Sequence, residues 1–184
     1  GMRRPRSCKA ICRGWGMCDN WKTQNLGTNC YIKARIGWRG LSASEYLEKG
    51  PFLIAGKHIE NGVIDWANCD HISEFRFRES HEIALAEGDI ILTKDGTIGR
   101  VARIDFLPGK ATINGTMMLV RPLKDIDYRF LYHILNGKEF AKLIDDKVSG
   151  SSIPHIFQRD MVMLPVSFPE LSQQQTIARI LDTL

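Results

Sequence analysis

The sequence predicts an α+β fold, a single compact mixed domain with a β-rich core and helices. Three observations support this prediction. Short apolar runs bounded by turn residues lie between residues 52 and 120, which is typical of strands. Apolar residues recur at helical spacing from residue 131 to 144 and again after residue 177. The chain of 184 residues, 43% hydrophobic and 25% charged, suits one globular domain.

The first strands are predicted between residues 52 and 66. Residues 52–55 and 63–66 are short apolar runs, and the Asn61-Gly62 pair between them is a strong turn signal. The stretch 68–82 is too polar for a core, so it predicts a surface loop or a short helix.

A hairpin over residues 89–105 is the clearest local pattern. Residues 89–93 predict one strand and residues 98–104 the returning one, because Asp95-Gly96 supplies the positive φ angles that a tight turn needs. A third strand is predicted over residues 116–120, before Pro122.

Two helical segments are predicted next. Apolar residues recur at i, i+3 and i+4 over 131–135 and over 140–144, and Asn136-Gly137 predicts a break between them. Asp127 is suited to cap the first segment. Residues 161–168 form an edge strand at best, because Pro165 interrupts them.

The sequence ends in an amphipathic segment. Ser172 and Gln175 have the spacing of a capping box, which predicts a helix start there. The apolar residues Ile177, Leu181 and Leu184 then fall on one helical face.

The formal charge of +4 belongs to the first 20 residues. They hold five basic residues and one acidic residue, so residues 21–184 are neutral and composition alone does not predict a nucleic-acid binder. Cys8, Cys12 and Cys18 lack a paired C-x2-C, so this tail is expected to be disordered rather than to bind zinc. Cys30 and Cys69 are expected to be buried.

Signals for export and membrane insertion are absent from the sequence. No apolar run approaches the roughly 18 residues of a membrane helix, and the basic start has no apolar signal core. We expect a reduced, cytoplasmic protein without a membrane partner.

Sequence signatures of catalysis are also absent. No phosphate-loop or dinucleotide-binding glycine pattern occurs, and no zinc-protease motif occurs. Asp145 and Lys147 have the D-x-K spacing found in metal-dependent nucleases, but a solvated charge run at a helix end is the favoured interpretation. His133 is interpreted as a partly buried histidine with a hydrogen-bond partner.

Two loops carry candidate binding chemistry. Residues 96–99 form a GXXG sequence flanked by Lys94, Arg100 and Arg103, which suits close approach to a nucleic-acid backbone, although a plain hairpin turn explains it equally well. Residues 150–155 offer hydroxyls, backbone amides and an imidazole to phosphates or base edges. An ordinary connecting loop is the alternative there.

Taken in order, these stretches resemble a known family. The matching segments are Trp21-Lys22, Leu26-Gly27 and residues 33–41, 50–54, 88–100, 150–154 and 170–181. Together they resemble the target recognition domain of the specificity subunit of type I restriction–modification systems. The resemblance implies a division into 1–20, a disordered or non-family basic tail; 21–170, the recognition domain; and 171–184, the start of a spacer (coiled-coil) helix.

The resemblance implies a function without catalysis in this chain. It implies sequence-specific recognition of one half of a split double-stranded DNA target, with modification subunits that methylate adenine and a restriction subunit as partners. S-adenosylmethionine, ATP and magnesium are expected on those partners and not on this chain. A second specificity domain or a second copy of the chain is a further candidate partner, because whole subunits of this family have two such domains.

We expect DNA contacts from side chains on loops, and no catalytic residue or metal ligand. The candidate DNA-binding residues are Lys94, Thr97, Arg100, Arg103, Ser151, Ser152, His155, Arg76, Arg78 and His71. The candidate partner face consists of Ile177, Leu181 and Leu184. Two alternatives stay open, namely a metal-dependent nuclease domain and an assembly module that does not bind DNA.

Overall fold

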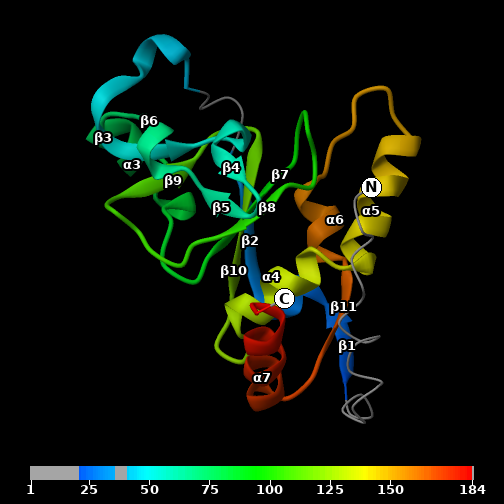
Figure 1. Ribbon diagram of the computed structural model, residues 1–184. Coiled ribbons are helices and arrows are strands. Elements are labelled where there is room, and N and C mark those ends of the chain that lie inside the picture. The colour runs from blue at the N-terminus through cyan, green and yellow to red at the C-terminus, as the bar shows by residue number, and fades with distance from the viewer. Residues whose placement is uncertain (1–20, 36–40, 184) are drawn as a thin grey trace.

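The computed structural model describes residues 21–35 and 41–183 (Figure 1). The strands are β1 (Lys22–Asn25), β2 (Cys30–Ala34), β3 (Leu47–Ile54), β4 (Ile59–Glu60), β5 (Val63–Ile64), β6 (Asp70–His71), β7 (Ile90–Thr93), β8 (Val101–Arg103), β9 (Ala111–Ile113), β10 (Met117–Pro122) and β11 (Pro165–Phe168). The α-helices are α2 (Leu26–Asn29), α3 (Glu74–Arg78), α4 (Tyr128–Leu135), α5 (Lys138–Ser149), α6 (Gln158–Val162) and α7 (Leu171–Leu181). The 3-10 turns are η2 (Ala43–Glu45), η3 (Gly56–His58), η4 (Trp66–Asn68) and η5 (His81–Ile83). The α+β prediction is confirmed.

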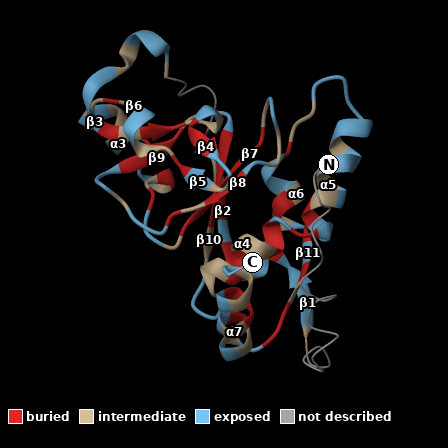
Figure 2. Cartoon of the chain, viewed as in Figure 1, coloured by how far each residue is buried: buried red, intermediate tan, exposed pale blue. Residues whose placement is uncertain are grey.

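A four-stranded antiparallel sheet in the order β2-β10-β7-β8 forms the centre of the molecule. Successive side chains of a strand point to opposite faces, and both faces of this sheet are buried. Ile90 and Leu92 belong to one hydrophobic cluster, whereas Ile91 and Leu119 belong to another. The sheet therefore separates two cores, and Figure 2 shows buried residues in both parts of the molecule.

Helices cover the first face and strands cover the second. Phe130 and Leu131 of α4 and Ile177 of α7 pack in the first cluster. The second cluster takes Ile54 from β3 and Ile113 from β9, which pair in parallel within a three-stranded sheet β6-β3-β9.

Most predicted elements are found close to their expected places. The hairpin is β7–β8, with Ile90 opposite Arg103, and its return strand begins later than predicted, at Val101. The break at Asn136-Gly137 separates α4 from α5, and Asp127 caps α4 by accepting hydrogen bonds from two backbone amides. The turn between β4 and β5 contains Asn61 at φ 50° and Gly62 at φ 81°.

The predicted capping box at Ser172 is wrong. Helix α7 begins two residues earlier, at Leu171, with Glu170 at the cap position and no side-chain cap bond. The glutamine that is bonded is buried Gln174, whose side chain accepts from Asp127 N at 2.9 Å and donates to Asp125 O at 3.1 Å and to Pro169 O at 2.9 Å. The helix start is thus fixed by a tertiary contact rather than by its own first turn.

Cys30 and Cys69 are buried, as predicted, and burial raises the pKa of each thiol to about 12. Both therefore remain protonated and poorly nucleophilic at neutral pH. The predicted tail with its three cysteines, residues 36–40 of the family-like stretch and Leu184 lie outside the described residues.

Candidate nucleic-acid interface

The two loops singled out in the sequence meet in the structure. Asp95 of the β7–β8 hairpin and His155 of the loop between α5 and α6 form an isolated antiparallel bridge. Ile156 N donates a hydrogen bond to Lys94 O at 3.0 Å across the same junction. Figure 1 shows the hairpin end beside the α5–α6 loop. We call residues 94–100 and 150–157 together the loop cluster.

Side-chain charges at this junction are paired. The Lys94 ammonium lies 2.5 Å from Asp95 Oδ2, and His155 Nδ1 pairs with Asp95 Oδ1. Lys94 is only 8% exposed. The Lys94 ammonium is thus largely buried against the carboxylate of its neighbour Asp95, which leaves it little exposed surface for the expected phosphate contact.

The end of the hairpin is ordered by Thr93 rather than by a two-residue turn. Its hydroxyl donates to Thr97 O at 2.6 Å and accepts from Arg100 N at 2.9 Å. Gly96 and Gly99 have φ angles of 71° and 85°, which suits glycine. A side chain at Gly99 would meet Ile144 of α5, whereas nothing lies near Gly96.

A cleft of about 340 Å³ opens beside the hairpin end. Its lining residues are Ala55, Gly56, Lys57, Thr93, Asp95, Thr97, Arg100 and Thr116. Arg100 is exposed and donates one hydrogen bond to Gly56 O at 3.3 Å. A guanidinium has five N–H donors, so most of those on Arg100 face open solvent, next to the exposed residues Thr97 and Thr116.

The second loop presents both polar and apolar groups. Ser151 Oγ closes a short turn onto Ile153, which is 80% exposed, and Ser152 beside it is exposed too. The Phe157 ring is approached by the cationic groups of Lys147 at 5.6 Å and Arg159 at 4.9 Å. The loop cluster thus combines hydroxyls, an apolar tip and nearby positive charge.

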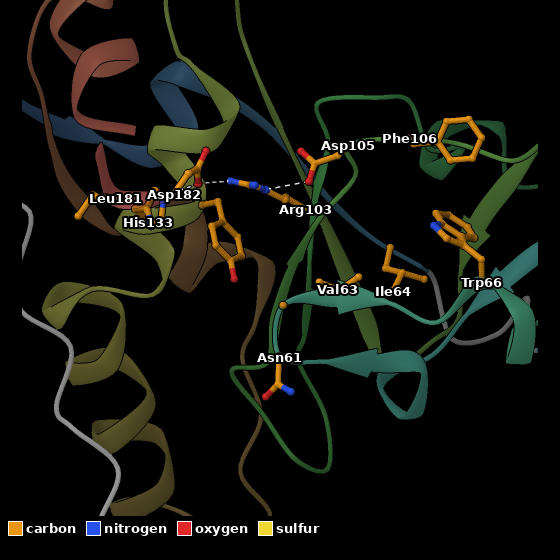
Figure 3. Close-up of a pocket in the computed structure, with 12 residues that line it drawn as sticks. Asn61, Val63, Ile64, Trp66, Arg103, Asp105, Phe106, His133, Leu181 and Asp182 are labelled. Atoms are coloured by element: carbon orange, nitrogen blue, oxygen red, sulfur yellow. Dashed lines mark hydrogen bonds and ion pairs between the residues drawn. The ribbon is translucent and has the colours of Figure 1, made fainter. Parts of the chain in front are cut away.

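Arg103 lies away from this cluster. Its guanidinium bonds Asp105 at 2.9 Å and Asp182 at 2.5 Å and lies 5.3 Å from the Tyr132 ring, at the side of a separate cavity of about 590 Å³ (Figure 3). Burial alone would lower the pKa of Arg103, but the hydrogen bonds that its guanidinium donates to the two carboxylates raise it. Arg103 joins β8 to α7 here and is not free to contact a phosphate.

Three further candidate DNA-binding residues lie on β6 and α3, namely His71, Arg76 and Arg78. Arg76 is paired with Glu45 at 2.6 Å and with Glu79 at 2.9 Å. His71 Nδ1 pairs with Gly50 O at 2.8 Å. Arg78 is exposed and has a contact of only 4.0 Å with a carboxylate of its own helix.

Sequence reasoning missed four residues that the fold brings to the cluster, namely Lys57, Thr116, Phe157 and Arg159. Lys57 and Thr116 adjoin strands β3 and β10, which no local pattern connects to the hairpin. The Phe157-x-Arg159 pair begins at the last residue of the second loop, so its aromatic–basic spacing was the signal that could have found it.

The expected partner face is partly used inside the chain. Ile177 is 3% exposed and packs in the first hydrophobic cluster, beneath the helices, so its side chain cannot meet a partner in this conformation. Leu181 is half-buried at the edge of that core.

Nothing in the described residues favours the nuclease alternative. Asp145 is exposed, and Lys147 pairs with Asp160 at 2.8 Å. Residues 21–35 and 41–183 contain no group of three acidic, histidine or cysteine side chains placed to bind a metal ion. Within the same ranges, no helix is long and apolar enough to cross a membrane.

Known proteins resemble this chain in sequence and in fold. Residues 43–184 match the family described as type I restriction modification DNA specificity domain. The chain is 31% identical over 173 residues to the MjaVIII specificity subunit of Methanocaldococcus jannaschii, a match that covers 88% of this chain and 39% of that protein. It is 26% identical over 170 residues to the EcoKI specificity subunit of Escherichia coli K12, with 90% and 36% covered.

The fold is similar to that of the HsdS subunit from Thermoanaerobacter tengcongensis, with a TM-score of 0.67 at 15% identity. That match covers 96% of this chain and 41% of the other. The chain therefore spans less than half the length of these relatives.

Proposed function

Because the chain belongs to the family of type I restriction modification DNA specificity domains, we propose that it recognises one half of a bipartite target in double-stranded DNA. The match over residues 43–184 is the observation that carries this proposal. The loop cluster supports a place for the contact, since it is an exposed surface of the described fold that offers hydroxyl, guanidinium and apolar groups together.

Phosphate contacts are assigned to the exposed cations around the loop cluster. Residues 21–184 have no net charge, so positive charge has to be supplied locally, and the exposed Arg100 and Arg159 supply it. Arginine suits this role because its guanidinium can make two hydrogen bonds to one phosphate.

Base contacts are assigned to the tip of the second loop. The Ser152 hydroxyl can donate to or accept from base edges in the major groove, and an apolar side chain such as Ile153 can contact the thymine methyl group. Such contacts specify sequence, whereas phosphate contacts set position on the duplex.

In this proposal the chain performs no catalysis itself. Modification subunits carry S-adenosylmethionine and methylate adenine, and a restriction subunit carries ATP and magnesium. The relatives named above are specificity subunits of type I restriction enzymes, which supports partners of this kind. The division into residues 1–20, 21–170 and 171–184 and a cytoplasmic location belong to the same proposal.

The function is tested by sequencing methylated adenines in cells with and without the gene that encodes this chain. We expect a split motif to lose its methylation when the gene is removed. An unchanged methylation pattern would contradict the proposal.

A second experiment separates the alternatives. The purified chain is mixed with duplexes that have a randomised centre, and bound duplexes are sequenced. Enrichment of one short motif without cleavage in magnesium supports recognition. Cleavage by the chain would support the nuclease, and no enrichment by an assembled complex would support the assembly module.

A further inference from the structure

The side-chain network of Lys94, Asp95 and His155 joins two loops that are distant in sequence. Asp95 and His155 are 60 positions apart, and their side chains pair directly. The second oxygen of the same carboxylate accepts from Lys94. One carboxylate thus connects the hairpin that carries Arg100 to the loop that carries Ser152 and Ile153.

The backbone around Asp95 supports the same junction. Lys94 N and Asp95 N both donate to Thr116 O, at 2.9 Å and 3.3 Å, and Lys94 O accepts from Ile156 N. On the other side, the His155 ring lies 4.3 Å from the Phe157 ring. The hairpin is therefore fixed on Thr116, immediately before β10, and the second loop is fixed on the hairpin.

The place of Asp95 is unfavourable for electrostatic attraction of DNA. Its side chain is 33% exposed and lines the same cleft as Thr97 and Arg100. A carboxylate at this position repels a phosphate unless its charge is compensated. Lys94 provides that compensation, and the contact with Asp95 makes Lys94 and His155 unavailable for DNA.

We propose that Asp95 is a positioning residue whose pairing with Lys94 and His155 sets the relative placement of the two DNA-contacting loops. This inference rests on the proposed function, because it assigns a role to the same surface. It also changes the role expected for His155, which holds a loop in place instead of reading DNA.

The proposal predicts that Asp95→Ala weakens DNA binding, whereas simple electrostatics predicts that it tightens binding. If Asp95 acts only through its charge, Asp95→Ala removes a repulsive group and binding to DNA tightens. If it holds the loops, the same change releases the second loop and binding weakens. We expect affinity to fall about tenfold, which corresponds to about 1.4 kcal/mol.

The experiment measures DNA binding of the full chain, with the randomised-centre duplexes and the motif they select as probes, over a series of salt concentrations. The variants are Asp95→Ala, His155→Ala and the double variant. Glu139→Ala, which removes an exposed carboxylate on α5, is the control for charge. Hydrogen exchange of residues 150–157 reports the placement of the loop independently of DNA.

We expect Asp95→Ala and His155→Ala to weaken binding equally, and the double variant to lose no more than either one. Exchange at the Ile156 amide should quicken in all three. The salt slope should fall, because it counts phosphate contacts per bound molecule and a protein with misplaced loops makes fewer of them. The slope is insensitive to the fraction of protein that is folded. Glu139→Ala should bind as tightly as the parent or more so.

Equal or tighter binding by Asp95→Ala overturns the proposal, as do additive losses in the double variant, which would mean that His155 contacts DNA by itself. Failure of the proposed function is distinguishable, because the parent itself then selects no motif. In that case quickened exchange in Asp95→Ala still supports the loop contact, and unchanged exchange refutes it.

Discussion

Arg100 and Arg103 lie on the same hairpin, yet their guanidinium groups have different surroundings. Arg100 has a single carbonyl partner at 3.3 Å, whereas Arg103 is bonded to two carboxylates. Sequence analysis made both arginines candidate DNA-binding residues, because a sequence shows which residues are charged but not which carboxylates they contact. Pairing decides which cation can meet a phosphate, since a guanidinium held by carboxylates has to break those bonds first.

Arg100→Ala is expected to weaken binding to duplexes of every sequence and to lower the salt slope by about 1, as for one lost phosphate contact. Lys124→Ala is the matched control. Lys124 is exposed and follows the end of β10, whereas Thr116 of the cleft precedes its start. Because the six residues of β10 span about 20 Å, Lys124 lies far from the cleft that Arg100 lines. Binding titrations from low to moderate salt measure both, and an unchanged slope for Arg100→Ala would make the hairpin purely structural.

His58 links pH to stability at a single side chain. It is 3% exposed, and its Nδ1 accepts a hydrogen bond from Ala55 N at 3.0 Å, so the neutral ring carries its proton on Nε2. Burial lowers the pKa of His58 below its usual value. The unfolded chain therefore binds this proton more readily, and the free energy of unfolding falls as pH drops below about 6.5.

His58→Asn keeps an acceptor and removes the titration, so we expect a smaller loss of stability between about pH 7.5 and about pH 5 than in the parent. Urea unfolding at both pH values measures this. His81→Asn is the control, because His81 is exposed. The same pH dependence in parent and His58→Asn would show that other groups are responsible.

At the scale of elements, the sequence predicted those features that depend on residues close together in the chain. The hairpin β7–β8, the Asp127 cap and the break before α5 are each specified by a few neighbouring residues, and each was found. Strands β1, β2 and β9 are among those that were not predicted. Their partners lie far along the chain, as in the pairing of Lys22 with Phe168, and four exposed residues such as those of β1 leave no apolar pattern.

Helix α7 shows the same limit at its start. The sequence pattern favoured Ser172 as a cap, but buried Gln174 bonds the α4 start instead. We expect Gln174→Ala to lower the free energy of unfolding by about 3 kcal/mol or more, because it leaves one amide and two carbonyls without this partner. Gln175→Ala, at an exposed neighbouring position, should cost less than about 0.5 kcal/mol. Urea unfolding of both variants gives the comparison, and similar losses would mean that the Gln174 bonds add little.

At the scale of the whole molecule, the candidate site depends on how the central sheet is placed. Residues 94–100 extend from the end of β7, Thr116 immediately precedes β10, and Lys57 follows β3. The sequence could name the loops, because glycine and hydroxyl residues mark them. It could not bring them together, since the contact between Asp95 and His155 follows from the packing of α5 and α6 beside this sheet.

The two cores share this one sheet, so we expect them to unfold together. Ile91 and Leu92 are adjacent, both fully buried, and belong to different clusters. Ile91→Ala and Leu92→Ala should each lower the free energy of unfolding by about 2–5 kcal/mol. Val63→Ala, at a position that is 67% exposed, should cost about 0.5 kcal/mol or less.

Unfolding followed by both far-ultraviolet circular dichroism and tryptophan fluorescence tests whether the cores are coupled. Trp21 packs against the first hydrophobic cluster and Trp66 against the second, so tryptophan fluorescence reports on both cores. One shared transition that moves to lower urea in each variant is expected, because Ile91 and Leu92 belong to the same strand and neither face can lose its packing while β7 stays in place. A variant that splits the transition in two would show that each core is stable without the other.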